Sequence, residues 1–178
     1  MAIVVRPSVD QDILHIILLI AQLRGPTPAP DQMEAVGVVY RSMLEDHNQV
    51  LRVAEIEGQI VGVMLGALRP RGNWLTPELW IADLAVTENG WRRGAGHALV
   101  KEALAIAEGW QCHQVVVETT RDDRALQSLL RSFDCDFTHR TFTRSLVAQS
   151  TLMGLAATGE ESAVPPVGVP LVIYDLGV

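Results

Sequence analysis

The sequence has few cysteines and no excess of positive charge, and both shortages exclude classes of function. Its 178 residues include 2 cysteines, Cys112 and Cys135, in no Cys-x-x-Cys or Cys/His spacing. This is too few for a disulfide framework and the wrong pattern for a metal site. We therefore expect reduced, partly buried thiols and no bound metal. With 14 Lys and Arg against 21 Asp and Glu, the net charge of −7 disfavours nucleic acid and suits a cationic small substrate.

Long apolar runs are also missing. The apolar run at residues 13–20 has eight residues, whereas a membrane-spanning helix needs roughly 20. It predicts a buried helix and no membrane partner. Residues 1–6 lack the basic stretch, apolar core and small-residue cleavage pattern of a secretory signal. We therefore expect a cytoplasmic protein.

The composition predicts one domain over residues 1–178. With 48% apolar and 20% charged residues, the chain is typical of a soluble globular domain with one substantial core. Residues 147–169, which contain many small residues and prolines, predict an insertion or linker before a final strand at 170–176.

Hydrophobic periodicity predicts a defined order of elements. Glu57 and Gly58 are typical of a hairpin turn, and Ser8 and Asp31 are expected helix N-caps. The predicted elements are strand 2–5, helix 9–23, helix 32–46, strands 50–56, 59–68 and 78–86, a helix ending near residue 109, strand 114–119, helix 124–133, and strands 137–146 and 170–176. This β-α-α-β-β-β-α-β-α-β(-β) order predicts an α/β (α+β) fold. Its sheet is mixed and mostly antiparallel, with six to seven strands and helices on both faces.

Residues 84–99 pass from an apolar strand through a glycine-bearing turn into a helix, which builds an anion site from backbone. The first helical turn has N–H groups without intrahelical acceptors and lies at the positive end of the helix dipole. Gly94 and Gly96 lack a Cβ and so allow a phosphate to approach closely. Arg92 and Arg93 add positive charge. The alternative is an ordinary turn that caps a surface helix.

The chain resembles the GNAT superfamily of acyl-CoA-dependent N-acyltransferases over most of residues 2–146. The resemblance rests on the element order, on residues 53–55 with 58–62, and on residues 83–86 with 91–99. The family's turn reads Gln or Arg, two residues, Gly, one residue, then Gly or Ala. Trp91 stands where Gln or Arg is usual, and Arg93 begins the same pattern two residues later. Residues 20–28 also resemble the first-helix end of small-molecule amine acetyltransferases.

The resemblance implies that acetyl-CoA binds at this turn and that CoA leaves as a product. The family's pantetheine arm would pair with Leu84, Ala85 and Val86, and the Val86 N–H would donate to the tetrahedral oxyanion. The pyrophosphate would lie on the amides of Arg92, Arg93, Gly94, Ala95, Gly96, His97 and Ala98.

For the amine acceptor, the resemblance makes Asp83 the base, because an acidic residue is common at this position. The alternative is an ordinary strand carboxylate. Glu78 and Trp80 join Asp83 as candidate substrate-binding residues, although Glu78 also fits a solvated charge at the start of a strand. Trp74, Trp80 and Trp91 are expected either to wall an acceptor pocket or to pack in the core.

The last helix departs from the family pattern. Leu130 stands where family members often carry the tyrosine that protonates the leaving thiolate, and Asp134 and Cys135 replace a Gly-Phe pair. Three explanations remain open. The thiolate leaves unaided or through water, Tyr174 substitutes from the final strand, or efficient catalysis has been lost.

We therefore expect an N-acetyltransferase that transfers the acetyl group of acetyl-CoA to a primary amine of a small molecule or peptide, by direct attack in a ternary complex. One alternative is a non-catalytic acyl-CoA-binding or sensor module, and another is a structural or dimerisation protein that keeps the fold. A homodimer is expected by analogy with similar sheets. The identity of the acceptor stays open.

Overall fold

The computed structural model describes residues 2–24, 27–72, 74–119 and 123–136. The chain divides into two units, Met1–Cys135 and Asp136–Val178, and the sheet with its helices belongs to the first. The predicted strands 137–146 and 170–176, and the predicted linker 147–169, lie outside the described residues.

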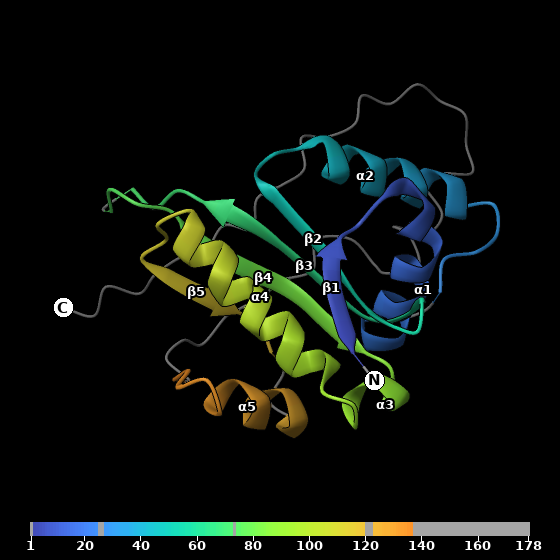
Figure 1. The fold of residues 1–178 in the computed structure, drawn as a ribbon. Coiled ribbons are helices and arrows are strands. Elements are labelled where there is room, and N and C mark those ends of the chain that lie inside the picture. Colours follow the sequence, from blue (N-terminus) through green and yellow to red (C-terminus); the bar gives the residue numbers. More distant parts are fainter. Residues whose placement is uncertain (1, 25–26, 73, 120–122, 137–178) are drawn as a thin grey trace. The chain divides into compact units, whose positions relative to one another are not determined.

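The order of elements within the described residues agrees with the sequence pattern (Figure 1). The strands are β1 (Ile3–Pro7), β2 (Gln49–Ile56), β3 (Gln59–Arg69), β4 (Glu78–Val86) and β5 (Gln114–Val117). The helices are the 3-10 helix η1 (Asp10–Asp12), α1 (Ile13–Arg24), α2 (Met33–Glu45), α3 (Glu88–Trp91), α4 (Ala95–Gly109) and α5 (Arg124–Arg131). The short α3 is an addition that the periodicity did not predict.

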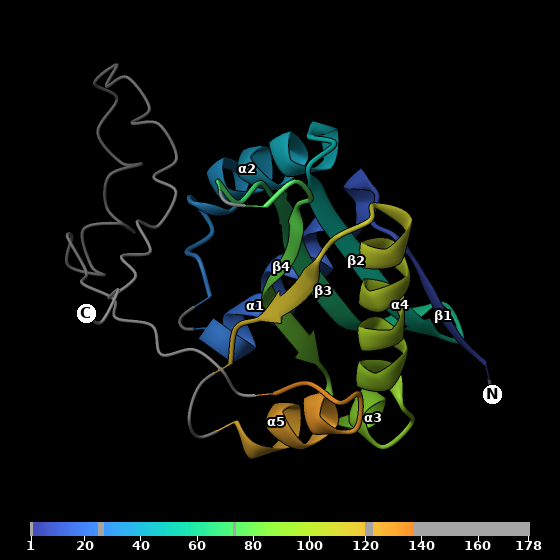
Figure 2. The same ribbon diagram turned by 90° about the vertical axis from the view of Figure 1, so that its left-hand side faces the viewer.

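The five strands form one sheet in the order β1-β2-β3-β4-β5. Neighbours are antiparallel except β4 and β5, which are parallel. Helix α4 covers one face, and α1 and α2 cover the other (Figure 2). Each face has its own apolar cluster: Leu79, Ile81 and Leu99 belong to the α4 face, whereas Ile16 and Leu65 belong to the α1/α2 face. The predicted mixed, mostly antiparallel sheet with helices on both faces is confirmed.

The predicted hairpin at Glu57 and Gly58 is confirmed. Both residues have positive φ, 55° and 76°, as the tightest two-residue hairpin turns require. Glycine adopts this conformation without steric cost. The turn sets the register of β2 against β3.

The predicted N-caps are wrong. Helix α1 is preceded by η1, whose N-cap is Val9, and the Asp12 carboxylate accepts the Val9 N–H at 2.8 Å. Ser8 Oγ is buried and has no hydrogen-bond partner among the described residues. For α2 the N-cap is Gln32 rather than Asp31. In both cases a side chain three residues downstream accepts the free N–H, since Gln32 Oε1 likewise accepts the Ala29 N–H at 3.0 Å.

A bulge in β4 decides which side chains reach each face. Leu65 pairs with Asp83 and Gly66 pairs with Ile81, so Ala82 is an extra residue. Side chains alternate between faces along a regular strand, and a bulge reverses this alternation beyond it. Leu79, Ile81 and Leu84 therefore share the α4 face, whereas Asp83 lies with Ala85 on the α1/α2 face.

Strands β3 and β4 approach each other closely at this bulge. A methyl group on Gly66 would lie 2.5 Å from the Trp80 carbonyl oxygen and 2.8 Å from Cδ1 of Ile81. The backbone of β4 would have to move to admit any side chain there. Glycine at this position is therefore a condition for the bulge and for the position of Asp83.

We expect Gly66→Ala to lower the free energy of unfolding by about 1–3 kcal/mol, the usual cost of overpacking. Gly109→Ala is the matched control, because a methyl group there meets nothing within 4 Å. Urea denaturation of the two variants and the wild type measures the difference. Equal midpoints for Gly66→Ala and wild type would contradict the assigned role of the close approach.

Candidate functional site

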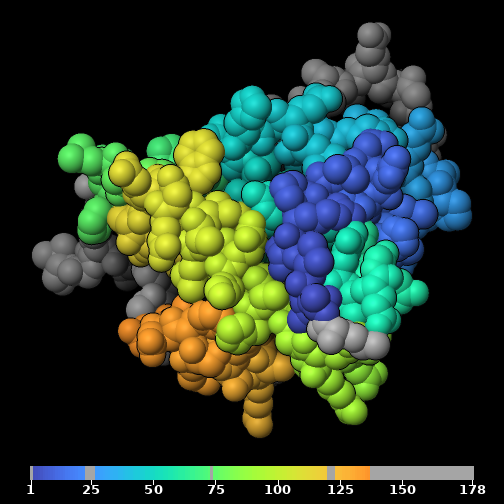
Figure 3. Space-filling model, in the orientation of Figure 1, coloured from blue at the N-terminus to red at the C-terminus, as the bar shows by residue number. Residues whose placement is uncertain are grey.

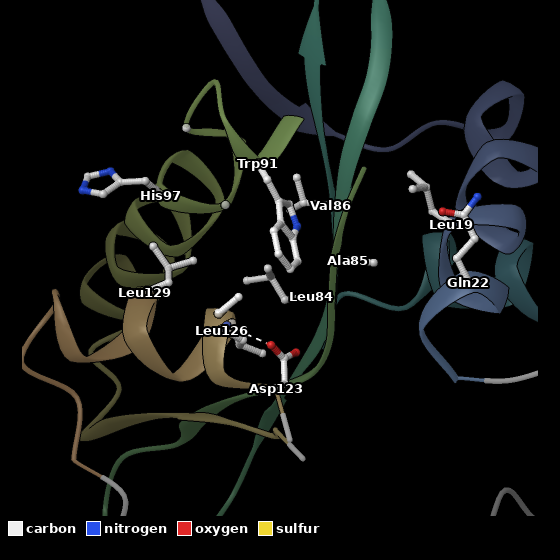
Figure 4. A pocket seen from close by; sticks show the side chains of 13 residues that line it. Leu19, Gln22, Leu84, Ala85, Val86, Trp91, His97, Asp123, Leu126 and Leu129 are labelled. Atoms are coloured by element: carbon white, nitrogen blue, oxygen red, sulfur yellow. Dashed lines mark hydrogen bonds between the residues drawn. The ribbon is translucent and has the colours of Figure 1, made fainter. Parts of the chain in front are cut away.

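The edge of β4 opens where its pairing with β5 stops. The parallel ladder runs from Glu78 to Ile81, and the Glu118 N–H donates to the Ile81 carbonyl at 2.9 Å. Beyond this point Leu84, Ala85 and Val86 line a cavity of about 420 Å³ (Figure 4). Its other walls come from α1, the turn before α4, α4 itself and α5: Leu19, Gln22, Trp91, Gly94, Gly96, His97, Asp123, Ala125, Leu126 and Leu129. The cavity therefore joins the predicted strand to the predicted glycine turn.

The start of α4 forms the polar end of this cavity. Gly94 is its N-cap with a φ of 85°, a conformation that favours glycine. The amides of Ala95, Gly96 and His97 have no acceptor within the helix, because they belong to its first turn. These amides and the helix dipole make the turn suited to an anion.

Three of the predicted phosphate-binding amides are already engaged. The N–H groups of Arg93 and Gly94 donate to the carbonyls of Gly90 at 3.2 Å and Trp91 at 3.3 Å, and Ala98 N–H donates to the Gly94 carbonyl at 3.0 Å. The predicted range of residues 92–98 therefore narrows to the first turn of α4.

Helix α3 positions Trp91 at the cavity. Thr87 caps this helix by accepting the Gly90 N–H at 3.1 Å, and its own N–H donates to the Val61 carbonyl at 2.8 Å. The Trp91 side chain reaches toward Leu84 (Figure 4) and is 56% exposed. The residue at the family's Gln or Arg position thus contributes an apolar wall.

Helix α5 gives the cavity a second apolar wall. In the space-filling view it lies against α4 (Figure 3), and a methyl group on Gly96 would lie 3.0 Å from Cδ2 of Leu129. Asp123 caps α5 by accepting the Leu126 N–H at 2.9 Å. Leu130 is 8% exposed and belongs to the core, whereas Leu126 and Leu129 line the cavity. The residues of α5 that line the cavity from within the helix carry no proton donor in their side chains.

His97 and Gln22 extend the set of cavity residues in different directions. The His97 ring packs against Phe133 with centroids 4.5 Å apart and is turned away from Trp91 (Figure 4). Gln22 lines the cavity from α1, next to Leu19 on the opposite side of β4. Sequence reasoning did not single out Gln22, because a glutamine near the end of an apolar helix carries no motif.

Asp83 lies on the α1/α2 face, two residues from the cavity-lining Ala85. Its neighbour from α2 is Tyr40, a partly buried side chain packed on the same face. Burial, and secondly the charge of the Asp83 carboxylate, raise the pKa of Tyr40 to about 12. Tyr40 therefore keeps its proton at neutral pH.

The expectation that Glu78 is solvated is wrong. Its side chain is 1% exposed, and both carboxylate oxygens are bound. Oε1 accepts hydrogen bonds from Arg69 at 2.8 and 3.1 Å, and Oε2 accepts one from Gln114 at 2.8 Å. Arg71 lies 3.4 Å from Oε2. This carboxylate joins β3, β4 and β5.

The three tryptophans do not wall one pocket. Trp91 lines the cavity. The Arg69 guanidinium lies 4.3 Å from the centre of the Trp80 ring, and the Trp80 indole N–H donates to Glu118 at 3.2 Å. Trp74 stacks on His113 with centroids 4.4 Å apart.

Both cysteines are free and partly buried, and burial raises the pKa of the Cys112 thiol. Among the described residues, no three His, Cys, Asp or Glu side chains come together as a metal site. Within the same ranges no helix has the length and apolar character needed to cross a membrane.

Comparison with known proteins identifies a family. The family model for the acetyltransferase (GNAT) family matches residues 17–134. No curated protein matches the chain.

Solved structures share the fold. An aminoglycoside acetyltransferase from an uncultured soil metagenomic sample, in complex with sisomicin, is 21% identical with a TM-score of 0.68, covering 82% of this chain and 97% of that one. Aminoglycoside N-acetyltransferase AAC(6')-Iy, in complex with CoA, is 16% identical with a TM-score of 0.68 and coverages of 82% and 96%. A transcriptional regulator from Bacillus halodurans is 16% identical with a TM-score of 0.73 and coverages of 82% and 100%. At these identities the likeness shows the fold alone.

The raised pKa of Tyr40 predicts a pH dependence of stability. A phenol whose pKa is raised from 10.0 to about 12 in the folded state stabilises the fold fully below pH 10. That contribution is lost as the pH rises through about 12, because the unfolded chain ionises first. We expect the free energy of unfolding of Tyr40→Phe to fall less steeply over this range. Urea denaturation at a series of alkaline pH values measures it, and parallel curves for the two proteins would contradict the shift.

Proposed function

The chain belongs to the acetyltransferase (GNAT) family, and we propose that it transfers an acetyl group from acetyl-CoA to a primary amine of a small molecule or peptide. The observation that carries this proposal is the cavity along the open edge of β4. It connects the first turn of α4 at one end with the Asp83 side of the sheet at the other.

The residues at the polar end fit the pyrophosphate of acetyl-CoA. The first-turn amides of Ala95, Gly96 and His97 supply donors without acceptors in the helix. The side chains of Arg92 and Arg93 add positive charge immediately before this turn. Gly94 and Gly96 line the cavity without side chains, so an anion can approach the backbone.

The strand edge fits the pantetheine arm. Leu84, Ala85 and Val86 lie past the last pair of the β4–β5 ladder, which leaves this edge available for strand-like hydrogen bonds. The thioester supplies an activated acyl group, so positioning accounts for most of the catalysis. The Val86 N–H is our proposed donor to the oxyanion of the tetrahedral intermediate.

Asp83 is our proposed base for the amine. An acceptor amine enters as an ammonium ion, and the Asp83 carboxylate attracts it and takes its proton. The amine nitrogen then forms the new bond to the acyl carbon, and the C–S bond breaks with its electron pair going to sulfur. Because Leu126 and Leu129 line the α5 wall, we infer that the thiolate takes its proton from water.

The proposed acceptor class is a small cationic amine. The net charge of −7 favours such a substrate, and two of the solved structures with this fold are named aminoglycoside acetyltransferases. Glu78 is not part of the proposed acceptor site, because both of its oxygens are engaged within the sheet. Trp80 lies on the α1/α2 face but is held by Arg69 and Glu118.

A non-catalytic acyl-CoA-binding module is the second candidate. The apolar α5 wall favours it, and so does the transcriptional regulator that shares the fold. Acetyl transfer to any amine above the uncatalysed rate would reject this candidate. The cytoplasmic location and the homodimer stay predictions.

We expect CoA to bind the wild-type chain and Arg93→Glu to weaken the Kd by about tenfold or more, because a charge next to the pyrophosphate is reversed. Lys101→Glu is the matched control. It makes the same charge change farther along α4, where salt screens its effect. Isothermal titration calorimetry measures both. Absence of binding at millimolar CoA, together with no effect of Arg93→Glu, would overturn the proposal.

We expect Asp83→Asn to lower kcat by about 100-fold, the usual contribution of a general base. The KM for acetyl-CoA should stay unchanged, because Asp83 lies outside the proposed cofactor half of the site. Thiol release with an aminoglycoside, a polyamine, an amino acid and a short peptide as acceptors measures both constants. Asp10→Asn, an exposed carboxylate paired with Arg41, is the control. Equal turnover of Asp83→Asn and wild type would remove Asp83 from the base role.

A further inference from the structure

Tyr40 lies over the part of the sheet that carries Asp83. It packs from α2 on the apolar cluster of the α1/α2 face, which includes Leu65 and Ala85. Leu65 is the cross-strand partner of Asp83, and paired residues place their side chains on the same face. The ring of Tyr40 and the Asp83 carboxylate are therefore neighbours on one side of β4.

The same face continues into the cavity. Leu19 and Ala85 belong both to the cluster under Tyr40 and to the cavity wall. The bulge at Ala82 places Asp83 on this face together with Ala85. Cavity, carboxylate and phenol thus follow one another along a single surface, with α2 covering the phenol.

The surroundings of Asp83 on this face are mainly aliphatic. Leu65 and Ala85, its nearest neighbours along and across the strands, offer no side-chain hydrogen bond. A partly buried carboxylate has several rotamers, and a proton acceptor works only when held near the proton that it takes. The Tyr40 hydroxyl is a donor, and it keeps its proton up to a pKa of about 12.

We propose that Tyr40 is a positioning residue for the amine-accepting side of the site: its hydroxyl holds the Asp83 carboxylate in the orientation that takes the proton from the acceptor amine. This inference rests on the proposed function. The proton moves from the ammonium nitrogen to Asp83, and Tyr40 keeps its own proton throughout. The base is thereby supported from α2, an element distant in sequence from the cofactor-binding turn.

The kinetic test compares Tyr40→Phe, Asp83→Asn and the double variant, with the acceptor of the amine panel that is turned over fastest. Phenylalanine keeps the ring and its packing and removes the hydroxyl alone. We expect Tyr40→Phe to lower kcat about tenfold with the KM for acetyl-CoA unchanged. The double variant should be no slower than Asp83→Asn, because the two residues act as one unit. Val39→Ala, an exposed neighbour on α2, should match the wild type.

A second measurement is independent of turnover. The chain has 2 tyrosines, Tyr40 and Tyr174, so ¹³Cζ-tyrosine NMR gives two signals, and Tyr40→Phe assigns them. We expect Asp83→Asn to lower the titration midpoint of Tyr40 from about 12 toward the ordinary 10.0, without reaching it, because burial is the larger cause. A structural role of Tyr40 in packing alone would leave this midpoint unchanged.

The outcomes separate the two proposals. Loss of turnover in Asp83→Asn with full turnover in Tyr40→Phe would overturn the positioning role and leave the proposed function standing. Additive losses in the double variant, or an unmoved Tyr40 midpoint, would also overturn it. A wild-type chain that acetylates no amine of the panel would overturn both proposals.

Discussion

The close approach of β3 to β4 at Gly66 is the constraint on which the site depends. There the Trp80 carbonyl occupies space that any side chain on Gly66 would need, and Ala82 is left over as an extra residue in β4. This single extra residue reverses the alternation of the strand. As a result Leu84 and Val86 face α4, while Asp83 and Ala85 face α1 and α2. One strand therefore presents a wall for the cofactor on one side and a carboxylate for the acceptor on the other.

The two halves of the site are built from different materials. The cofactor half uses backbone: the first-turn amides of α4 and the strand edge left open after Ile81. Backbone groups are present whatever the side chain, so Trp91 at the family's Gln or Arg position leaves this half intact. The acceptor half depends on side chains, and there the chain has its own set, with Leu126 and Leu129 on α5 and Tyr40 beside Asp83.

Errors in the sequence reasoning arose where a side chain has more than one available partner. Ser8 has the composition of an N-cap, but its N–H donates to the Leu51 carbonyl and Asp12 takes the capping role. Glu78 at the start of a strand reads as a solvated charge, yet two arginines and Gln114 surround it. In each case the deciding partner lies on another element, which local pattern does not register.

By itself, the sequence determined the order and type of the elements, the hairpin at Glu57 and Gly58, and the glycine turn before α4. These features follow from periodicity and backbone preference over a few residues, which are local quantities. Only the tertiary structure decided that Ala82 is a bulge, that Leu130 is buried while Leu129 lines the cavity, and that Tyr40 meets Asp83. Those outcomes depend on pairing and packing between distant segments, where a shift of one residue moves a side chain to the opposite face.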